Sequence, residues 1–169
     1  TEGRVVKAKE AAEKSLRLDP SLAAAHVAMG AYYYHGKLEY DNALKEFDQA
    51  LLLQPNNAEA LTGIGAVKRR QGMFEDAAMN FSKALETDPR QGSLNEELAI
   101  TYVFLRRFQE SERYSDKAIA LSPDWPEPYA NKADAYLRWD GNISKARATL
   151  GEAASRKVEE KDPHFTHTA

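Results

Sequence analysis

Apolar residues recur along this chain at the spacing of amphipathic helices, and short polar turns separate those helices in pairs. Between residues 58 and 91, two such patterns flank a break at Gly72 and end just before Pro89. Apolar side chains spaced three and four residues apart lie on one face of a helix. This stretch therefore predicts two helices that pack against each other, and nearly the same pattern recurs upstream and downstream.

Prolines mark a regular repeat of this helix pair. Pro20, Pro55, Pro89 and Pro123 are separated by 35, 34 and 34 residues. Repeats of this length bury their apolar faces against neighbouring repeats and form solenoids. We therefore predict an all-α fold of about nine helices, over residues 2–18, 22–35, 40–53, 57–71, 74–87, 93–105, 108–121, 125–139 and 143–157.

Helix ends also carry local signals. Ser21 and Asp124 are expected to cap the helices that follow them, since their side-chain oxygens accept bonds from the first free backbone N–H groups. Gly36 is expected to end the second helix. Residues 158–169 lack periodicity and are expected to be a tail or the start of a further unit.

Small and aromatic residues occupy fixed positions within each repeat. Small side chains let the two helices of a pair approach closely, and an aromatic plug at Phe47 and Phe81 becomes Ser115 and Leu150 later in the chain. In this order of positions the chain resembles the tetratricopeptide repeat family. The small and tyrosine-type positions that carry the resemblance are Gly30, Gly65, Ala99 and Ala133; Tyr33, Lys68, Tyr102 and Tyr136; Ala8, Ala43, Ala77, Ser111 and Ala146; and Ser15, Ala50, Ala84, Ala118 and Ala153.

The resemblance implies a right-handed α-solenoid of antiparallel helix pairs, in which the first helix of each pair lines a concave face. We expect one array over residues 1–157, as a half-repeat 1–22 followed by repeats 23–57, 58–91, 92–125 and 126–157. One residue is inserted in the first full repeat and one in the last, near Gly36 and Gly141. Because the helical pattern starts almost at Thr1, we expect the chain to be a piece of a longer protein.

Composition narrows the class of protein further. Hydrophobic residues make up 43% and charged residues 29% of the chain, as in ordered globular proteins. The net charge of −3 disfavours nucleic acid or an acidic membrane as a partner. No apolar run approaches the roughly 20 residues of a membrane span. The absence of cysteine excludes disulfides and fits both the cytoplasm, which we favour, and the periplasm.

Side chains on the predicted concave face form columns from one repeat to the next. The columns are basic at Arg69 and Arg70 and apolar around Phe104, with acidic edges. Such a face suits an extended or helical peptide that is held by a few apolar anchors and oriented by charge. The predicted groove residues are Tyr34, His35, Arg69, Arg70, Glu96, Glu97, Ile100, Val103, Phe104, Asn131, Asp134 and Arg138.

Parts of this groove have a second interpretation. Arg69 and Arg70 bind a carboxylate or phosphate, or they only offset the dipole at a helix end. Ile100, Val103 and Phe104 line the groove, or they pack against the neighbouring helix. Gly63 weakens its helix by about 1 kcal/mol relative to alanine, and we expect it to open room in the groove.

The positions where some family members carry the Lys and Asn clamp for chaperone tails are Val27, Ala31 and Gly63 or near them, so that function is not transferred. No nucleophile, base and acid set stands out, and His164 and His167 are too few for a metal site. We therefore expect no catalysis, cofactor or metal, and predict a protein-interaction module that binds a peptide or protein segment.

Three alternatives to peptide binding stay open. Residues 2–18 lack a partner helix, which leaves Val5 and Leu16 partly bare and makes self-association through the array ends possible. The chain also loosely resembles the helical arrays of bacterial signalling enzymes, which implies a regulatory domain. An RNA-binding array of 35-residue repeats is disfavoured by the acidic balance.

Overall fold

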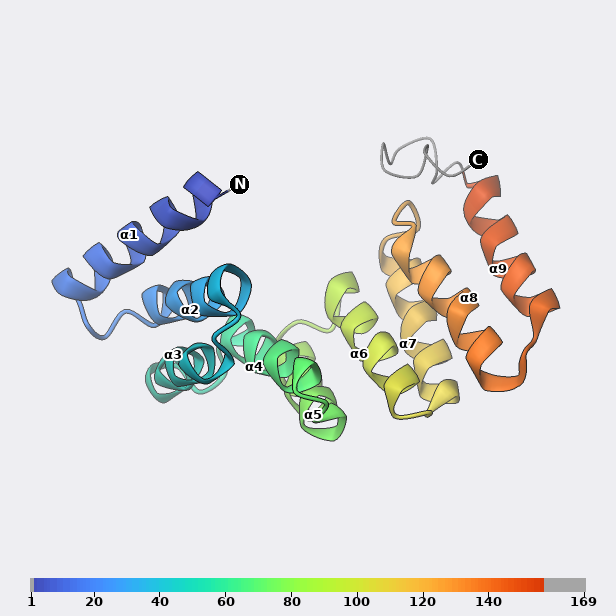
Figure 1. Cartoon of the computed structure of the whole chain (residues 1–169). Helices are drawn as coiled ribbons and strands as arrows, with labels where there is room; N and C mark the ends of the chain where they lie inside the picture. The colour runs from blue at the N-terminus through green and yellow to red at the C-terminus, as the bar shows by residue number, and fades with distance from the viewer. Residues whose placement is uncertain (1, 157–169) are drawn as a thin grey trace. The chain divides into compact units, whose positions relative to one another are not determined.

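The computed structural model describes residues 2–156, and these residues form an all-α repeat fold without strands (Figure 1). The chain divides into two compact units, Thr1–Thr87 (unit 1) and Asp88–Ala169 (unit 2), which are described separately. The predicted fold class is confirmed. In chain order the elements are α1 (Glu2–Leu18), α2 (Ala23–Ala31), the π-helical turn η1 (Tyr32–Lys37), α3 (Tyr40–Leu53), α4 (Ala58–Arg70), α5 (Phe74–Thr87), α6 (Gly92–Phe104), α7 (Phe108–Leu121), α8 (Glu127–Asp140) and α9 (Ile143–Ser155).

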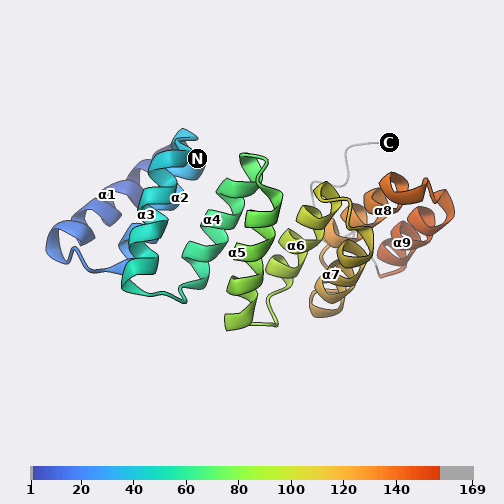
Figure 2. The same ribbon diagram turned by 90° about the horizontal axis from the view of Figure 1, so that it is seen from below.

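In unit 1, consecutive helices from α1 to α5 lie side by side (Figure 2). Alanines at Ala43, Ala50 and Ala60 are fully buried at the helix contacts, as expected for positions that set a close helix approach. The ring of Phe47 is 2% exposed and lies in one core cluster with Ile64 of α4. Phe47 is thus a plug between neighbouring helix pairs.

Two glycines make the room that the Phe47 ring occupies. A Cβ atom placed on Gly30 of α2 would lie 2.6 Å from Phe47 Cε1, and one on Gly63 of α4 would also lie 2.6 Å from it. Both contacts are far too short for real atoms. The expectation that Gly63 opens the groove was therefore wrong, because its missing side chain admits the plug instead.

In unit 2, α6 packs on α7, α7 on α8, and α8 on α9. Leu94 and Leu98 of α6 are buried, and Tyr129 of α8 is fully buried with its hydroxyl donating to the carbonyl of Pro123 at 3.0 Å. The ring of Phe108 stacks on that of Trp139, with centroids 5.9 Å apart. Aromatic residues thus tie the second helix pair of this unit to the first.

Each of the two inserted residues is accommodated in the last turn of the first helix of its repeat. In the repeats without an insertion, the backbone bond that closes this turn joins residues five positions apart. In the two repeats with an insertion it joins residues six positions apart, and the first of these turns is η1. Single π-turns of this kind accommodate one extra residue in a helix. The closing bonds run from the N–H of Glu39 to Tyr33, of Met73 to Lys68, of Arg107 to Tyr102, and of Asn142 to Tyr136.

A left-handed residue follows the first helix of each repeat. Gly72 and Gly141 adopt it with φ of 79° and 68°, but Leu38 and Arg106 adopt it as well, with φ of 57° and 56°. Gly36, which was predicted to break the helix, lies inside η1. The first helix thus ends in the same left-handed turn at a fixed position of every repeat, and that position does not require glycine.

Two predicted caps are wrong. Leu22 precedes α2 and Pro126 precedes α8, and neither side chain caps its helix. Ser21 instead donates from its N–H and its Oγ to the carboxylate of Asp19, at 2.9 and 2.6 Å. The predicted tail, including His164 and His167, lies outside the described residues, as does the side chain of Val5.

Candidate functional site

The predicted groove residues of unit 1 lie at the end of two first helices. Arg70 Nε donates to the hydroxyl of Tyr34 at 3.4 Å, and the Tyr34 and His35 rings are 4.5 Å apart in an edge contact. The guanidinium of Arg69 lies 5.5 Å from the centroid of the Phe81 ring. Tyr34, His35 and Arg70 therefore lie together, whereas Arg69 lies against the Phe81 ring.

In unit 2, side chains from α6, α7 and α8 enclose a pocket of about 180 Å³. Ala99, Ser111 and Ser115 form part of its lining. The other lining residues all come from the predicted groove, and they are Ile100, Val103, Phe104, Asn131, Asp134 and Arg138. We call this site the serine-lined pocket.

The serine-lined pocket stands where unit 1 has its plug. Ser115 occupies the repeat position of Phe47, which it follows by two repeats of 34 residues. Of the two glycines beside Phe47, Gly63 corresponds to Asn131 by the same spacing, whereas Gly30 corresponds to Ala99 at 69 residues because the first full repeat has one inserted residue. Ala99 and Asn131 both line the pocket. A large ring that fills this space in unit 1 is thus replaced by a small hydroxyl, which leaves a hole.

The floor of this pocket carries two buried hydroxyl groups. Ser111 and Ser115 are each 1% exposed, and neither Oγ has a hydrogen-bond partner within the described part of the chain. A buried hydroxyl without a partner costs about 1 to 3 kcal/mol, so such groups are rare in proteins. The pocket therefore combines apolar walls with an unsatisfied polar floor.

The mouth of the pocket is partly charged and partly aromatic. Phe104 is 54% exposed, and Arg138 Nε donates to Asp134 Oδ2 at 2.5 Å on the surface. Asn131 Nδ2 donates to Glu96 Oε1 at 2.5 Å. Glu96 itself is only 4% exposed, so it lies beneath the surface and does not form the acidic edge that was predicted.

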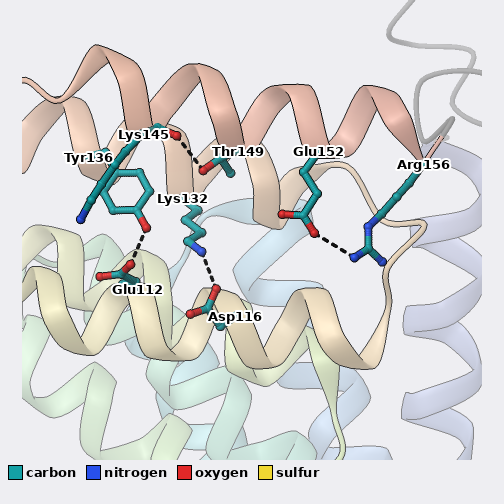
Figure 3. Close-up of polar contacts among 8 residues, drawn as sticks. All are labelled: Glu112, Asp116, Lys132, Tyr136, Lys145, Thr149, Glu152 and Arg156. Carbon is teal, nitrogen blue, oxygen red and sulfur yellow. Dashed lines mark hydrogen bonds and ion pairs between the residues drawn. The ribbon is translucent and has the colours of Figure 1, made fainter.

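Polar contacts also fasten α8 to α7 (Figure 3). The hydroxyl of Tyr136 donates to Glu112 Oε1, and Lys132 Nζ donates to Asp116 Oδ1. Burial raises the pKa of the Tyr136 hydroxyl well above its usual range, and the neighbouring Glu112 carboxylate raises it further. These bonds fix the position of α8, which carries Asn131 on the pocket wall.

The structure places the apolar trio of α6 on the surface of a pocket. Ile100 and Val103 are half-buried, Phe104 is exposed, and all three line the pocket. Ser111 and Ser115 also line the pocket, and neither was among the predicted groove residues. The signal was present, because both serines replace larger or apolar residues at fixed repeat positions.

Other chemistry is limited in the described residues. Among them, no three His, Cys, Asp or Glu side chains gather in a way that could hold a metal ion. The ring nitrogens of His26 bond to Glu46 Oε2 at 2.8 Å and to the carbonyl of Pro20 at 3.1 Å, which ties α2 to α3. None of the helices in residues 2–156 has the length and apolar character needed to cross a membrane.

Repeated antiparallel helix pairs with small residues at their contacts define an all-α helical-repeat protein. No protein-family model matches the chain. The type IV pilus assembly protein PilF of Pseudomonas aeruginosa is 26% identical over 134 residues, which cover 78% of this chain and 53% of that protein. The Hsp70-Hsp90 organising protein of Plasmodium falciparum is 30% identical over 96 residues, covering 56% and 38%. The chain thus spans about half the length of these curated relatives or less.

Solved structures specify the kind of helical repeat. MamA from Desulfovibrio magneticus RS-1 superposes with a TM-score of 0.81 at 18% identity, over 95% of this chain and 89% of that one. YrrB, described as a TPR protein with an unusual peptide-binding site, superposes with a TM-score of 0.74 at 18% identity, over 98% and 83%. The chain has the tetratricopeptide repeat fold, and the resemblance found in its sequence is confirmed.

Proposed function

We propose that the chain is a noncatalytic protein-interaction module that binds a peptide or protein segment across the first helices of its repeats. One observation carries this proposal: six of the twelve predicted groove residues line a single pocket in unit 2. Proteins with this fold include one described by its peptide-binding site and relatives named for assembling a pilus or organising chaperones.

The character of the pocket supports a peptide ligand. Interaction sites of this kind combine a few apolar anchors with polar groups that fix the orientation of the bound segment. Here Phe104 offers an exposed aromatic ring, while Asp134 and Arg138 offer a charged rim. We therefore take unit 2 as the principal binding site and the Tyr34, His35 and Arg70 cluster of unit 1 as a second contact area.

A displayed peptide library tests this function. Peptides selected on the wild-type chain should bind the Phe104→Ala variant at least about tenfold more weakly, the change expected when an anchor worth about 1.4 kcal/mol is lost. Met79→Ala is the matched control, because Met79 is 50% exposed in α5 and lies outside the predicted groove. Equal affinity of wild type and folded Phe104→Ala for every selected peptide would contradict the proposal.

Exposed apolar residues favour self-association as a second candidate. Leu18 of α1 is 79% exposed, and Ile143 and Leu150 of α9 are 58% and 46% exposed. Helix faces with such residues can stack on another copy of a solenoid. Multi-angle light scattering decides between a monomer, which would remove this candidate, and an assembly that Leu18→Glu or Ile143→Glu disperses.

The remaining predictions concern what the chain does not do. We propose that it neither turns over a substrate nor binds nucleic acid, and a regulatory role beside a bacterial signalling enzyme stays a prediction. Turnover by the chain on a broad substrate panel would contradict the first statement. RNA binding that weakens steeply with added salt would contradict the second, because it would reveal phosphate contacts.

A further inference from the structure

We infer that the partner segment inserts a tyrosine side chain into the serine-lined pocket, as a plug supplied by the partner in place of the one this repeat lacks. The inference rests on the proposed function and names the residue that its pocket selects. Its three supports are the shape of the pocket, the hydrogen-bonding groups on its floor and the charges at its mouth.

Unit 1 shows what fits this position. There a six-membered aromatic ring, that of Phe47, fills the space against Gly30 and Gly63 and is 2% exposed. Ser115 leaves a pocket of about 180 Å³ at the equivalent position, but Ala99 and Asn131 carry side chains where Gly30 and Gly63 have none, so an entering ring cannot lie as the Phe47 ring does. A flat ring that enters from outside between α6 and α8 fits such a slot better than a branched aliphatic side chain.

The floor of the pocket selects a ring with a hydroxyl group. The Oγ atoms of Ser111 and Ser115 are buried and have no hydrogen-bond partner among residues 2–156. A tyrosine hydroxyl donates one hydrogen bond and accepts others, so it can pair with both serines. Phenylalanine would leave the two serine hydroxyls buried and unpaired, and discrimination on this ground is large in proteins.

The mouth of the pocket favours a neutral occupant. Asp134 is held by Arg138, and Glu96 is buried beneath the surface with Asn131 donating to it. The Asp134 and Arg138 pair at the rim carries no net charge, so a carboxylate or phosphate would lose its hydration on entering without gaining a free opposite charge. Phe104 remains 54% exposed beside the mouth, where an edge or offset contact with an entering ring stabilises it.

Binding of p-cresol, the side chain of tyrosine as a free molecule, tests the pocket directly. Titration followed by amide NMR should shift the signals of Ser111, Ser115 and Ala99, with a dissociation constant on the order of millimolar for so small a ligand. Toluene should bind at least about fivefold more weakly, because it cannot bond to the serines. Shifts that are absent from these three residues, or equal affinity for toluene, would overturn the inference.

Ser115→Leu blocks the pocket with the residue that stands at the same position in the last repeat, Leu150. It should abolish the p-cresol shifts, while Ser144→Leu on the exposed side of α9 should leave them intact. The double variant Ser111→Ala, Ser115→Ala keeps the pocket open and should bind toluene and p-cresol about equally. Persistence of p-cresol binding in folded Ser115→Leu would overturn the inference.

Selected peptides separate this inference from the function beneath it. Among peptides that bind the wild-type chain, changing one tyrosine to phenylalanine should cost about tenfold in affinity, and phosphorylating it should cost at least as much. Peptides that bind without any aromatic preference and ignore Ser115→Leu would overturn the tyrosine pocket and leave the interaction module standing. A library from which no peptide binds would overturn both.

Discussion

The two units of this chain solve the same packing problem differently at one repeat position. In unit 1, Phe47 lies between two helix pairs and closes the space against Gly30 and Gly63. In unit 2, the equivalent position is Ser115, and the space remains a pocket with hydroxyls on its floor. A plug and a binding site are thus alternative uses of one location in the repeat.

This difference shows that a repeat protein can use the same position for stability in one repeat and for recognition in another. Each repeat is stabilised mainly by contacts with its neighbours, so one repeat can lose a plug while the others keep theirs. Unit 2 offsets the missing ring with contacts elsewhere, including the Phe108 and Trp139 stack and the bonds from α8 to Glu112 and Asp116. Removing the Phe47 ring should therefore destabilise unit 1, whereas removing the Ser115 hydroxyl should stabilise unit 2.

Phe47→Ala should give the largest effect, a loss of about 3 to 5 kcal/mol in the unfolding free energy of unit 1. The ring is 2% exposed, and its removal leaves a cavity that two glycines cannot fill. Urea denaturation followed by circular dichroism measures it. Leu52→Ala in the same helix is the control, because Leu52 is 75% exposed and should change stability by less than about 0.5 kcal/mol. A small loss for Phe47→Ala would mean that the ring is not a plug.

Gly63→Ala should be the next largest, with a net loss of about 2 kcal/mol. The added Cβ would meet the Phe47 ring, and overpacking costs typically 1 to 3 kcal/mol even though alanine favours a helix. Gly151→Ala in α9 is the matched control, because beyond the backbone of its own helix nothing lies within 4 Å of its Cβ position. That change should stabilise unit 2 by up to about 1 kcal/mol. Gain in both variants would contradict the account of Gly63.

The repeat period explains how much of this structure the sequence could predict. Ala43, Phe47 and Ala50 were placed by repeat spacing alone, and the bounds of α5 and α7 agree with prediction at both ends. The two cap predictions failed, because Leu22 and Pro126 stand directly before α2 and α8, and the Ser21 hydroxyl donates to the Asp19 carboxylate instead. Local side-chain competition of this kind is invisible to a pattern that reports only residue type.

The site was predictable only in part, for a physical reason. Repeat spacing identified Ile100 and Asp134 as surface residues of first helices, and both line the pocket. Repeat spacing also showed that Phe47 and Phe81 give way to Ser115. Whether the space left by such a change closes or stays open depends on how far the helices relax, which requires coordinates. Gly63 was misinterpreted for the same reason, since its partner ring lies 16 positions away in the preceding helix.

Tyr136→Phe tests the contacts by which unit 2 offsets its missing ring, with an expected loss of about 1 to 2 kcal/mol at neutral pH. The variant loses the hydrogen bond to the Glu112 carboxylate. The pKa of Tyr136 is raised in the folded state above its ordinary value of 10.0, so the unfolded wild type releases this proton first as pH rises past 10. The wild type therefore loses stability in that range, whereas the variant, which lacks the hydroxyl, has no such loss. The difference between the two proteins should therefore shrink above pH 10 in urea titrations. A difference that grows there would contradict the bond.

Ser115→Ala should have the smallest effect and the opposite sign, a gain of up to about 1 kcal/mol in the unfolding free energy of unit 2. Removing a buried hydroxyl that has no partner relieves its desolvation cost, and the enlarged cavity offsets part of that gain. Ser82→Ala, at a half-buried position of α5, serves as the control for a serine outside the pocket. A loss of several kcal/mol at Ser115 would show that its hydroxyl holds the fold together. The pocket would then be a by-product of packing, and the contrast between Phe47 and Ser115 would concern stability alone.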